Sequence, residues 1–153
     1  MPANLPIPLH RQQSEGDCLP ACLQMILDYW GQPASREELS HLLDTDPDVG
    51  TPASRALRLQ SPRLSVTYIQ ADPAALRRWL AQSVPVIVLV DTGELPYWPR
   101  RCAHAIVLVG LEGSTAYVND PAFETAPLSV PFDDLVLASD AMSNMVIVVT
   151  PSA

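Results

Sequence analysis

Cys18, His104 and Asp120 are the residues of this chain whose types suit nucleophilic catalysis. A thiol attacks a carbonyl carbon once a base has taken its proton; histidine is the commonest base, and a carboxylate can hold the imidazole in place. Gln12, with five residues between it and Cys18, could donate its side-chain N–H to the oxyanion that forms, beside the backbone N–H of Cys18. These four residues together indicate acyl chemistry through a Cys-His-Asp triad with a Gln oxyanion donor.

A loop and a helix must position Cys18. Residues 14–17 are rich in turn formers, and apolar residues at three- and four-residue spacing follow them. The pattern predicts a helix from about Cys18 to Trp30, with Asp17 as its N-cap and Pro20 tolerated in the first turn. At the N-terminus of a helix, unpaired N–H groups and the helix dipole favour negative charge, so the thiolate of Cys18 is favoured.

A hairpin is expected to bring His104 to Asp120. Strands are predicted over 103–111 and 115–119, and the midpoint between His104 and Asp120 falls on residue 112, at the turn Glu112-Gly113. A strict two-residue loop would place the two side chains on opposite faces of the sheet. We therefore predict a loop of odd length, or a kink at Asp120-Pro121. Asn119 is a rival orienting residue, and it should face the other side of the strand.

The order of Gln12, Cys18, a helix, and then His104 and Asp120 far downstream resembles the double-glycine leader peptidases, papain-like cysteine peptidases that process bacteriocin precursors. The resemblance implies that Cys18 is the nucleophile, His104 the base, Asp120 the orienting acid and Gln12 an oxyanion donor. It also implies a papain-like fold and a substrate whose leader ends in two small residues.

Two features depart from that family. Leu19 stands where the family usually has glycine after the nucleophile, so it is expected to contact substrate and to narrow or reshape the cleft. The family domain is commonly fused to a membrane transporter, and no transporter sequence is present here, so a transporter partner would act in trans.

The sequence also indicates the surroundings of two aromatic residues and two further cysteines. Tyr97 and Trp98 precede the strand of His104 and could wall a substrate groove, or could simply pack. Cys22 lies one helical turn after Cys18 and is expected in the core. Cys102 is expected to be a small buried residue, with the alternative that it forms a disulfide with Cys18 under oxidation.

Composition limits the classes of protein. At 153 residues the chain is expected to form a single papain-like domain, 1–153. A net charge of −8 argues against nucleic acid as a partner. Three cysteines, no signal-peptide pattern and no apolar run near ~20 residues favour a cytoplasmic protein with free thiols and no membrane insertion. The expected partner is a peptide or precursor protein.

The order of elements predicts the fold class. Helices are expected at 18–30, 35–43, 51–59 and from 73, with a short one after 131; strands are expected at 64–68, 86–90, 103–111, 115–119, 128–130 and 145–149. Helices that come mainly first, followed by an antiparallel sheet, indicate an α+β protein in which N-terminal helices pack on the sheet.

Two other functions and a metal site are alternatives to the peptidase. The same triad could transfer an acyl group to an amine instead of water. A domain of this fold could bind leader peptides or partner proteins without cleaving them. Zinc held by Cys18, Cys22, His104 and Asp120 is disfavoured, because two ligands spaced in this way on one helix are atypical. We expect no metal and no cofactor.

Overall fold

The fold is seen in a computed structural model, which describes residues 4–152. The elements are α1 (Cys18–Tyr29), α2 (Arg36–Leu42), the 3₁₀ helix η1 (Ala53–Leu59), β1 (Leu64–Gln70), α3 (Pro73–Ala81), β2 (Val86–Asp91), the 3₁₀ helix η2 (Thr92–Glu94), β3 (Ala103–Glu112), β4 (Thr115–Asn119), β5 (Leu128–Pro131), α4 (Phe132–Asp140) and β6 (Met145–Pro151). Within this range, no helix has the length and apolar character that a bilayer span requires.

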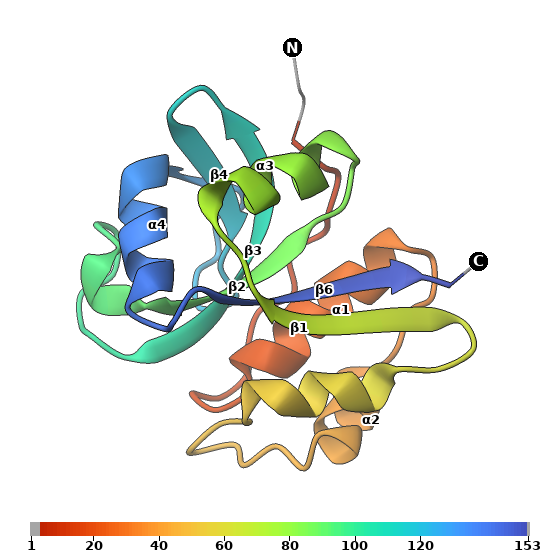
Figure 1. The fold of residues 1–153 in the computed structure, drawn as a ribbon. Helices are drawn as coiled ribbons and strands as arrows, with labels where there is room; N and C mark the ends of the chain where they lie inside the picture. The colour runs from red at the N-terminus through yellow and green to blue at the C-terminus, as the bar shows by residue number, and fades with distance from the viewer. Residues whose placement is uncertain (1–3, 153) are drawn as a thin grey trace.

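The six strands form one antiparallel sheet in the order β1-β6-β2-β3-β4-β5 (Figure 1). Helices α1 and α2 lie on one face, which confirms the α+β class with N-terminal helices packed on the sheet. Helices α3 and α4 cover the opposite face, an arrangement that the simple order of helices before strands does not predict.

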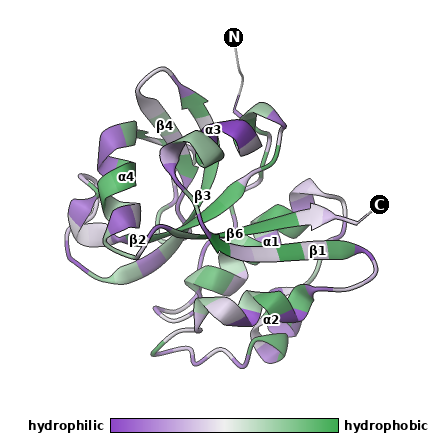
Figure 2. Ribbon diagram, viewed as in Figure 1, coloured by the Kyte–Doolittle hydropathy of each residue, from purple (hydrophilic) through white to green (hydrophobic). Residues whose placement is uncertain are grey.

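Both faces of the central strands are therefore buried. Figure 2 shows hydrophobic residues along β2, β3 and β6. In β3, Val107 and Val109 join the core beneath α1, whereas Ile106 and Leu108 join the core beneath α3 and α4. The continuous apolar run follows from this burial, since a strand covered on both sides has no polar face.

Local signals set the ends of several elements as predicted. Ser35 accepts a hydrogen bond from the N–H of Glu38 and starts α2, and Asp72 accepts from the N–H of Ala75 and starts α3. Gly31 follows α1 with φ +72°, the left-handed conformation that ends helices. The third predicted helix, over residues 51–59, is present as a 3₁₀ helix over residues 53–59.

The hairpin of β3 and β4 contains a bulge that the sequence analysis did not predict. Its loop is the two-residue turn Gly113-Ser114, so the expectation of an odd-length loop is wrong. The register shifts instead between Leu108 and Gly110, where Val109 is the extra residue. With a two-residue loop and no bulge, the side chains of His104 and Asp120 would project from opposite faces of the sheet. The one extra residue in β3 reverses this. As a result, the strand positions of His104 and Asp120 fall on the same side of the sheet.

The N-terminal segment ties this hairpin to the rest of the fold. The N–H of Leu5 donates to the carbonyl of Val109 at 2.9 Å, so the bulged residue has a hydrogen-bond partner. The side-chain amide of Asn119 donates to the carbonyl of Ile7 at 2.9 Å. As expected for a segment with prolines at alternate positions, residues 4–10 join no strand.

Candidate active site

Cys18 is the first residue of α1, as the sequence predicts. Its thiol is partly exposed, at the helix end where N–H groups of the first turn are directed. Pro20 lies in the first turn and has no N–H, so the first-turn donors nearest the thiol are the backbone N–H groups of Cys18 and Leu19. This geometry can stabilise negative charge next to the sulfur.

Asp17 occupies the N-cap position of α1, but its carboxylate does not cap the helix. It turns back into the loop and accepts hydrogen bonds from the N–H groups of Gln13 and Ser14, both at 3.0 Å. It also pairs with the guanidinium of Arg36 at 2.8 Å. The prediction of Asp17 as a side-chain cap is therefore wrong, because Arg36 and the loop amides compete for the same oxygens.

His104 and Asp120 are hydrogen-bonded, with Nε2 of His104 2.7 Å from Oδ1 of Asp120. Both side chains are almost fully buried. Burial alone would lower the pKa of His104, but the hydrogen bond to Asp120, the interaction with Cys18 and their charges outweigh it and raise this pKa to about 9. Burial opposes ionisation of Asp120, yet His104 and the hydrogen-bond donors around the carboxylate lower its pKa. The pair thus favours an imidazolium facing a carboxylate.

The imidazole is left with one nitrogen for Cys18. Because Nε2 is bonded to Asp120, Nδ1 is the atom that can exchange a proton with the thiol. Cys18 and His104 line the same cavity of about 190 Å³. A base between a thiol and a carboxylate is the arrangement that activates a sulfur nucleophile.

Tyr97 and Trp98 hold the second oxygen of Asp120. The hydroxyl of Tyr97 and the indole N–H of Trp98 each donate to Oδ2 at 2.8 Å. The indole also packs edge-on against the imidazole of His104, with ring centroids 4.8 Å apart. Burial, and then the charge of Asp120, raise the pKa of the Tyr97 hydroxyl, so it remains a proton donor.

Of the two alternatives for Tyr97 and Trp98, a groove wall or packing, the structure shows packing contacts with Asp120 and His104. Neither residue lines the cavity beside Cys18. The sequence places both residues in the loop just before the strand of His104. Only the folded chain shows that this loop contacts Asp120.

The cavity beside Cys18 is mostly apolar. Leu19 forms part of its wall. The remaining lining residues are Glu15, Val49, Gly50, Thr51, Ala53, Leu89, Ala103, Ala105 and Met142. Val49 is 85% exposed at the tip of a turn that is closed by two backbone hydrogen bonds between Asp46 and Gly50.

Gln12 lies in the nucleophile loop (residues 11–17) but not among the residues that line this cavity. Its backbone N–H donates to the carbonyl of Pro121 at 2.8 Å, which links the loop to the turn after Asp120. Its side-chain Nε2 donates to the carbonyl of Ser14 at 3.1 Å. Its Oε1 is buried and has no hydrogen-bond partner within residues 4–152. The second N–H of the amide remains available for another acceptor.

The other two cysteines differ from Cys18. Cys22 is fully buried, as expected, and its thiol donates to the carbonyl of Ala105 at 3.4 Å. Burial and then the charges of Cys18 and Asp120 raise the pKa of Cys22, which keeps it a thiol. Cys102 is partly exposed, not buried as expected, and its sulfur accepts from the hydroxyl of Thr92 at 3.5 Å. Within residues 4–152, no three His, Cys, Asp or Glu side chains converge as metal ligands.

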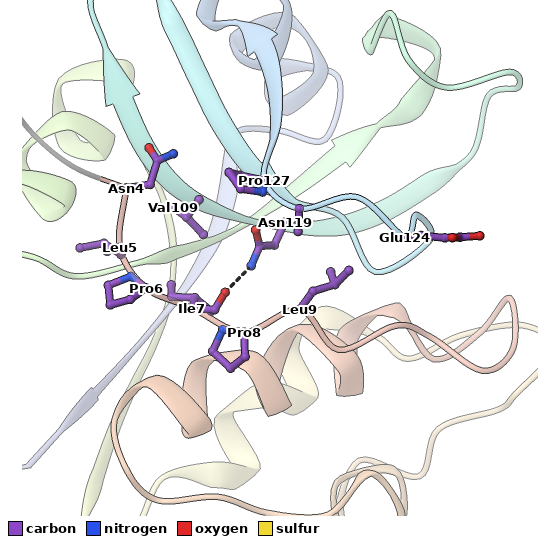
Figure 3. Close-up of a pocket in the computed structure, with 11 residues that line it drawn as sticks. Asn4, Leu5, Pro6, Ile7, Pro8, Leu9, Val109, Asn119, Glu124 and Pro127 are labelled. Atoms are coloured by element: carbon purple, nitrogen blue, oxygen red, sulfur yellow. Dashed lines mark hydrogen bonds between the residues drawn. The ribbon is translucent and has the colours of Figure 1, made fainter.

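A larger groove, of about 650 Å³, lies along the N-terminal segment (Figure 3). Its walls include Leu5, Ile7 and Leu9 on one side and Val109 and Asn119 on the other. None of the described residues that line it is a cysteine or a histidine. The smaller cavity at Cys18 is therefore the candidate active site.

Comparisons with known proteins agree with the fold described above. A model of the peptidase C39 family matches residues 6–151. A double-glycine motif protease from an AMS/PCAT transporter, solved with its leader peptide, superposes with a TM-score of 0.76 at 20% identity, over 98% of this chain and 95% of that one. The peptidase domain of Streptococcus ComA, a bi-functional ABC transporter of a quorum-sensing pathway, gives 0.75 at 21% identity, over 94% and 98%. The comparison with curated proteins gave no match.

Proposed function

This chain belongs to the peptidase C39 family, and we propose that it is a cysteine peptidase whose triad is Cys18, His104 and Asp120. The observation that carries the proposal is the position of His104. One ring nitrogen is bonded to a buried carboxylate at 2.7 Å, and the other is left for a thiol that lines the same cavity.

In the first half of the reaction, the thiolate of Cys18 attacks the substrate carbonyl carbon and the carbonyl electron pair moves to oxygen. The backbone N–H of Cys18 and the free N–H of Gln12 stabilise this oxyanion. When the carbonyl re-forms, the carbon–nitrogen bond breaks, and the imidazolium of His104 gives its proton to the departing amine. A pKa of about 9 for His104 suits this step, because the imidazolium is then populated near neutral pH.

In the second half, water attacks the thioester carbon while His104 takes its proton. The carbon–sulfur bond then breaks, which releases the carboxylic acid product and restores the thiolate. Throughout, Asp120 keeps the ring oriented and stabilises its positive charge, and Tyr97 and Trp98 fix the far oxygen of that carboxylate.

We infer that the substrate is a peptide or precursor protein with a leader of the double-glycine type. The family and the mostly apolar cavity beside Cys18 support this inference. Leu19 lies in the wall of that cavity and would narrow the position next to the scissile bond. The chemistry needs Cys18 as a free thiol, which suits a reducing compartment such as the cytoplasm.

The first test measures thiol reactivity, with an internal control. Cys102 is partly exposed, as Cys18 is, but does not line the cavity with His104. Iodoacetamide at neutral pH should therefore alkylate Cys18 much faster than Cys102, as followed by peptide mass spectrometry, and His104→Ala should remove the difference. Equal labelling of the two cysteines would favour a domain that binds peptides without cleaving them.

The second test measures cleavage. Candidate double-glycine precursors are incubated with the wild type and with Cys18→Ala, and the products are identified by mass spectrometry. Cleavage by the wild type alone supports the peptidase. A product that carries an added amine would show acyl transfer, and a bound but intact precursor would show a binding domain.

A further inference from the structure

The side chain of Arg36 is the feature that the proposed mechanism leaves unexplained. Arg36 is the first residue of α2, and its side chain is only 9% exposed. A cation at a helix N-terminus opposes the helix dipole, and burial of a guanidinium costs free energy unless its partners are well placed. The stability of α2 therefore does not account for this residue.

The guanidinium of Arg36 joins three parts of the site. It donates to Oδ2 of Asp17 at 2.8 Å, to the backbone carbonyl of Arg11 at 2.8 Å and to the side-chain oxygen of Gln24 at 3.0 Å. Arg11 and Asp17 are the two ends of the nucleophile loop, and Gln24 is on α1. One buried cation thus fixes both ends of the loop against the helix that carries Cys18.

These bonds also restrain the backbone on both sides of Gln12. The peptide group before it is held because the carbonyl of Arg11 accepts from Arg36, while the N–H of Gln12 donates to Pro121. The peptide group after it is held because the N–H of Gln13 donates to Asp17, which Arg36 holds in turn. The position of the proposed oxyanion donor therefore depends on Arg36.

The ion pair of Arg36 with Asp17 has a second consequence, at the start of α1. Asp17 occupies the N-cap position, where a carboxylate normally accepts from first-turn N–H groups. Because Arg36 and the loop amides hold its oxygens, it makes no such bond, and the N–H groups of Cys18 and Leu19 stay free of a side-chain cap. A carboxylate that capped α1 would place negative charge where the oxyanion forms.

We propose that Arg36 is a positioning residue for the oxyanion site: it places Gln12 and keeps the carboxylate of Asp17 away from the N-terminus of α1. This inference rests on the proposed function, since it assigns a role within that reaction. Arg36 does not touch substrate and acts only through the loop.

Two probes separate this role from a merely structural one. A leader-type peptide aldehyde ending in glycinal adds reversibly to the Cys18 sulfur, and its oxygen then occupies the oxyanion site. Iodoacetamide alkylates the same sulfur with loss of iodide and forms no oxyanion. Arg36→Met should weaken aldehyde binding and lower kcat by about 10- to 100-fold, the scale of an impaired oxyanion donor. The alkylation rate of Cys18 should fall much less than aldehyde binding does, because no oxyanion forms in that reaction.

Controls use other arginine and glutamine variants of the full chain. Arg58→Met removes an exposed arginine that bonds the carbonyl of Leu42 at the far end of α2, and it should leave aldehyde binding unchanged. In a Gln12→Ala background, Arg36→Met should cost less than it does in the wild type, because part of its effect passes through Gln12. Thermal unfolding of each variant reports how much folded protein is present. If Arg36→Met does not fold, Arg36→Lys is used in its place, because it keeps the charge but cannot reach all three acceptors. It should show the same pattern, with a smaller loss of aldehyde binding and of kcat.

The outcomes are distinguishable. Wild-type protein that binds no aldehyde and cleaves no precursor contradicts the proposed function and the inference with it. A wild type that binds aldehyde, together with an Arg36 variant that binds it equally well, overturns the inference alone. An equal loss of alkylation and aldehyde binding would mean a general loss of structure, and it also overturns the inference. Costs that simply add with Gln12→Ala would mean that Arg36 does not act through Gln12, and they overturn it too.

Discussion

Trp98 donates its indole N–H to Oδ2 of Asp120 at 2.8 Å, while the other oxygen of that carboxylate is bonded to His104. Tyr97 donates to the same Oδ2. The two carboxylate oxygens therefore have separate partners: Oδ2 is anchored by the loop that precedes β3, and Oδ1 faces the imidazole. The orientation of the proposed base depends on this loop as well as on the sheet.

Removal of the Tyr97 hydroxyl should lower activity without removing any atom that reacts. Tyr97→Phe deletes one of two donors to Oδ2, and a hydrogen bond to a charged group contributes about 1.5–3 kcal/mol. We expect kcat/KM for precursor cleavage to fall about tenfold or more. Tyr29→Phe is the matched control, because its hydroxyl bonds the exposed carbonyl of Ser83 and should be dispensable. Equal activity of the two variants would contradict an orienting role for Tyr97.

The alkaline limit of activity should depend on Asp120. Cleavage needs a proton on His104 for the departing amine, so activity should fall as the pH rises through about 9. The hydrogen bond and the charge of Asp120 both raise the pKa of His104, so Asp120→Asn should move the alkaline limit to lower pH and reduce the maximal rate. Asp28→Asn, which breaks the pair of Asp28 with His10, should leave the limit in place. A pH profile of kcat/KM tests both variants.

The stability of the protein should follow the same titration. The folded-state pKa of His104, about 9, lies above its ordinary value of 6.5, so the folded protein holds this proton more tightly than the unfolded chain. The stabilisation is fully present below pH 6.5 and is lost as the pH rises to about 9. Urea unfolding at several pH values should show this decline in the wild type, and His104→Gln should show a flatter dependence. Identical slopes would argue against a charged His104 in the folded state.

The parts of the site that short stretches encode could be predicted from sequence. Cys18 begins α1 because turn formers give way there to an apolar helical pattern. The hairpin that carries His104 and Asp120 follows from two apolar runs around Gly113. Asn119 points away from His104, to the carbonyl of Ile7, as the alternation of strand side chains requires.

The remaining parts depend on contacts between distant segments. The bulge at Val109 is stabilised by the N–H of Leu5, and no local pattern specifies it. The carboxylate of Asp17 turns away from α1 because Arg36 arrives from the next helix. The sequence predicts only that Tyr97 and Trp98 wall a groove or pack, because their bonds to Asp120 join distant segments of the chain. In each case the partner lies far away in the sequence, so only the tertiary structure determines the contact.

We expect substitution of Gly16 to lower stability and activity, because the nucleophile loop and the turn 46–50 pack backbone to backbone there. The N–H of Gly16 donates to the carbonyl of Pro47 at 2.8 Å, and a Cβ at Gly16 would lie 2.2 Å from the backbone oxygen of Asp46. Backbone atoms cannot rotate away, so Gly16→Ala must push the turn 46–50 off the loop. We expect a loss of about 1–3 kcal/mol in the free energy of unfolding. Since Val49 at this turn lines the cavity of Cys18, KM should rise as well.

Gly110→Ala is the matched control for this substitution. A Cβ at Gly110 would meet first the side-chain oxygen of Asn4, at 2.0 Å, and that flexible side chain can turn aside. We therefore expect a smaller loss of stability, under about 1 kcal/mol, and an unchanged KM. Denaturant unfolding and steady-state kinetics on both variants separate the two cases. If Gly16→Ala were as stable and as active as Gly110→Ala, close packing of the turn 46–50 on the nucleophile loop would not be what shapes the cavity beside Cys18.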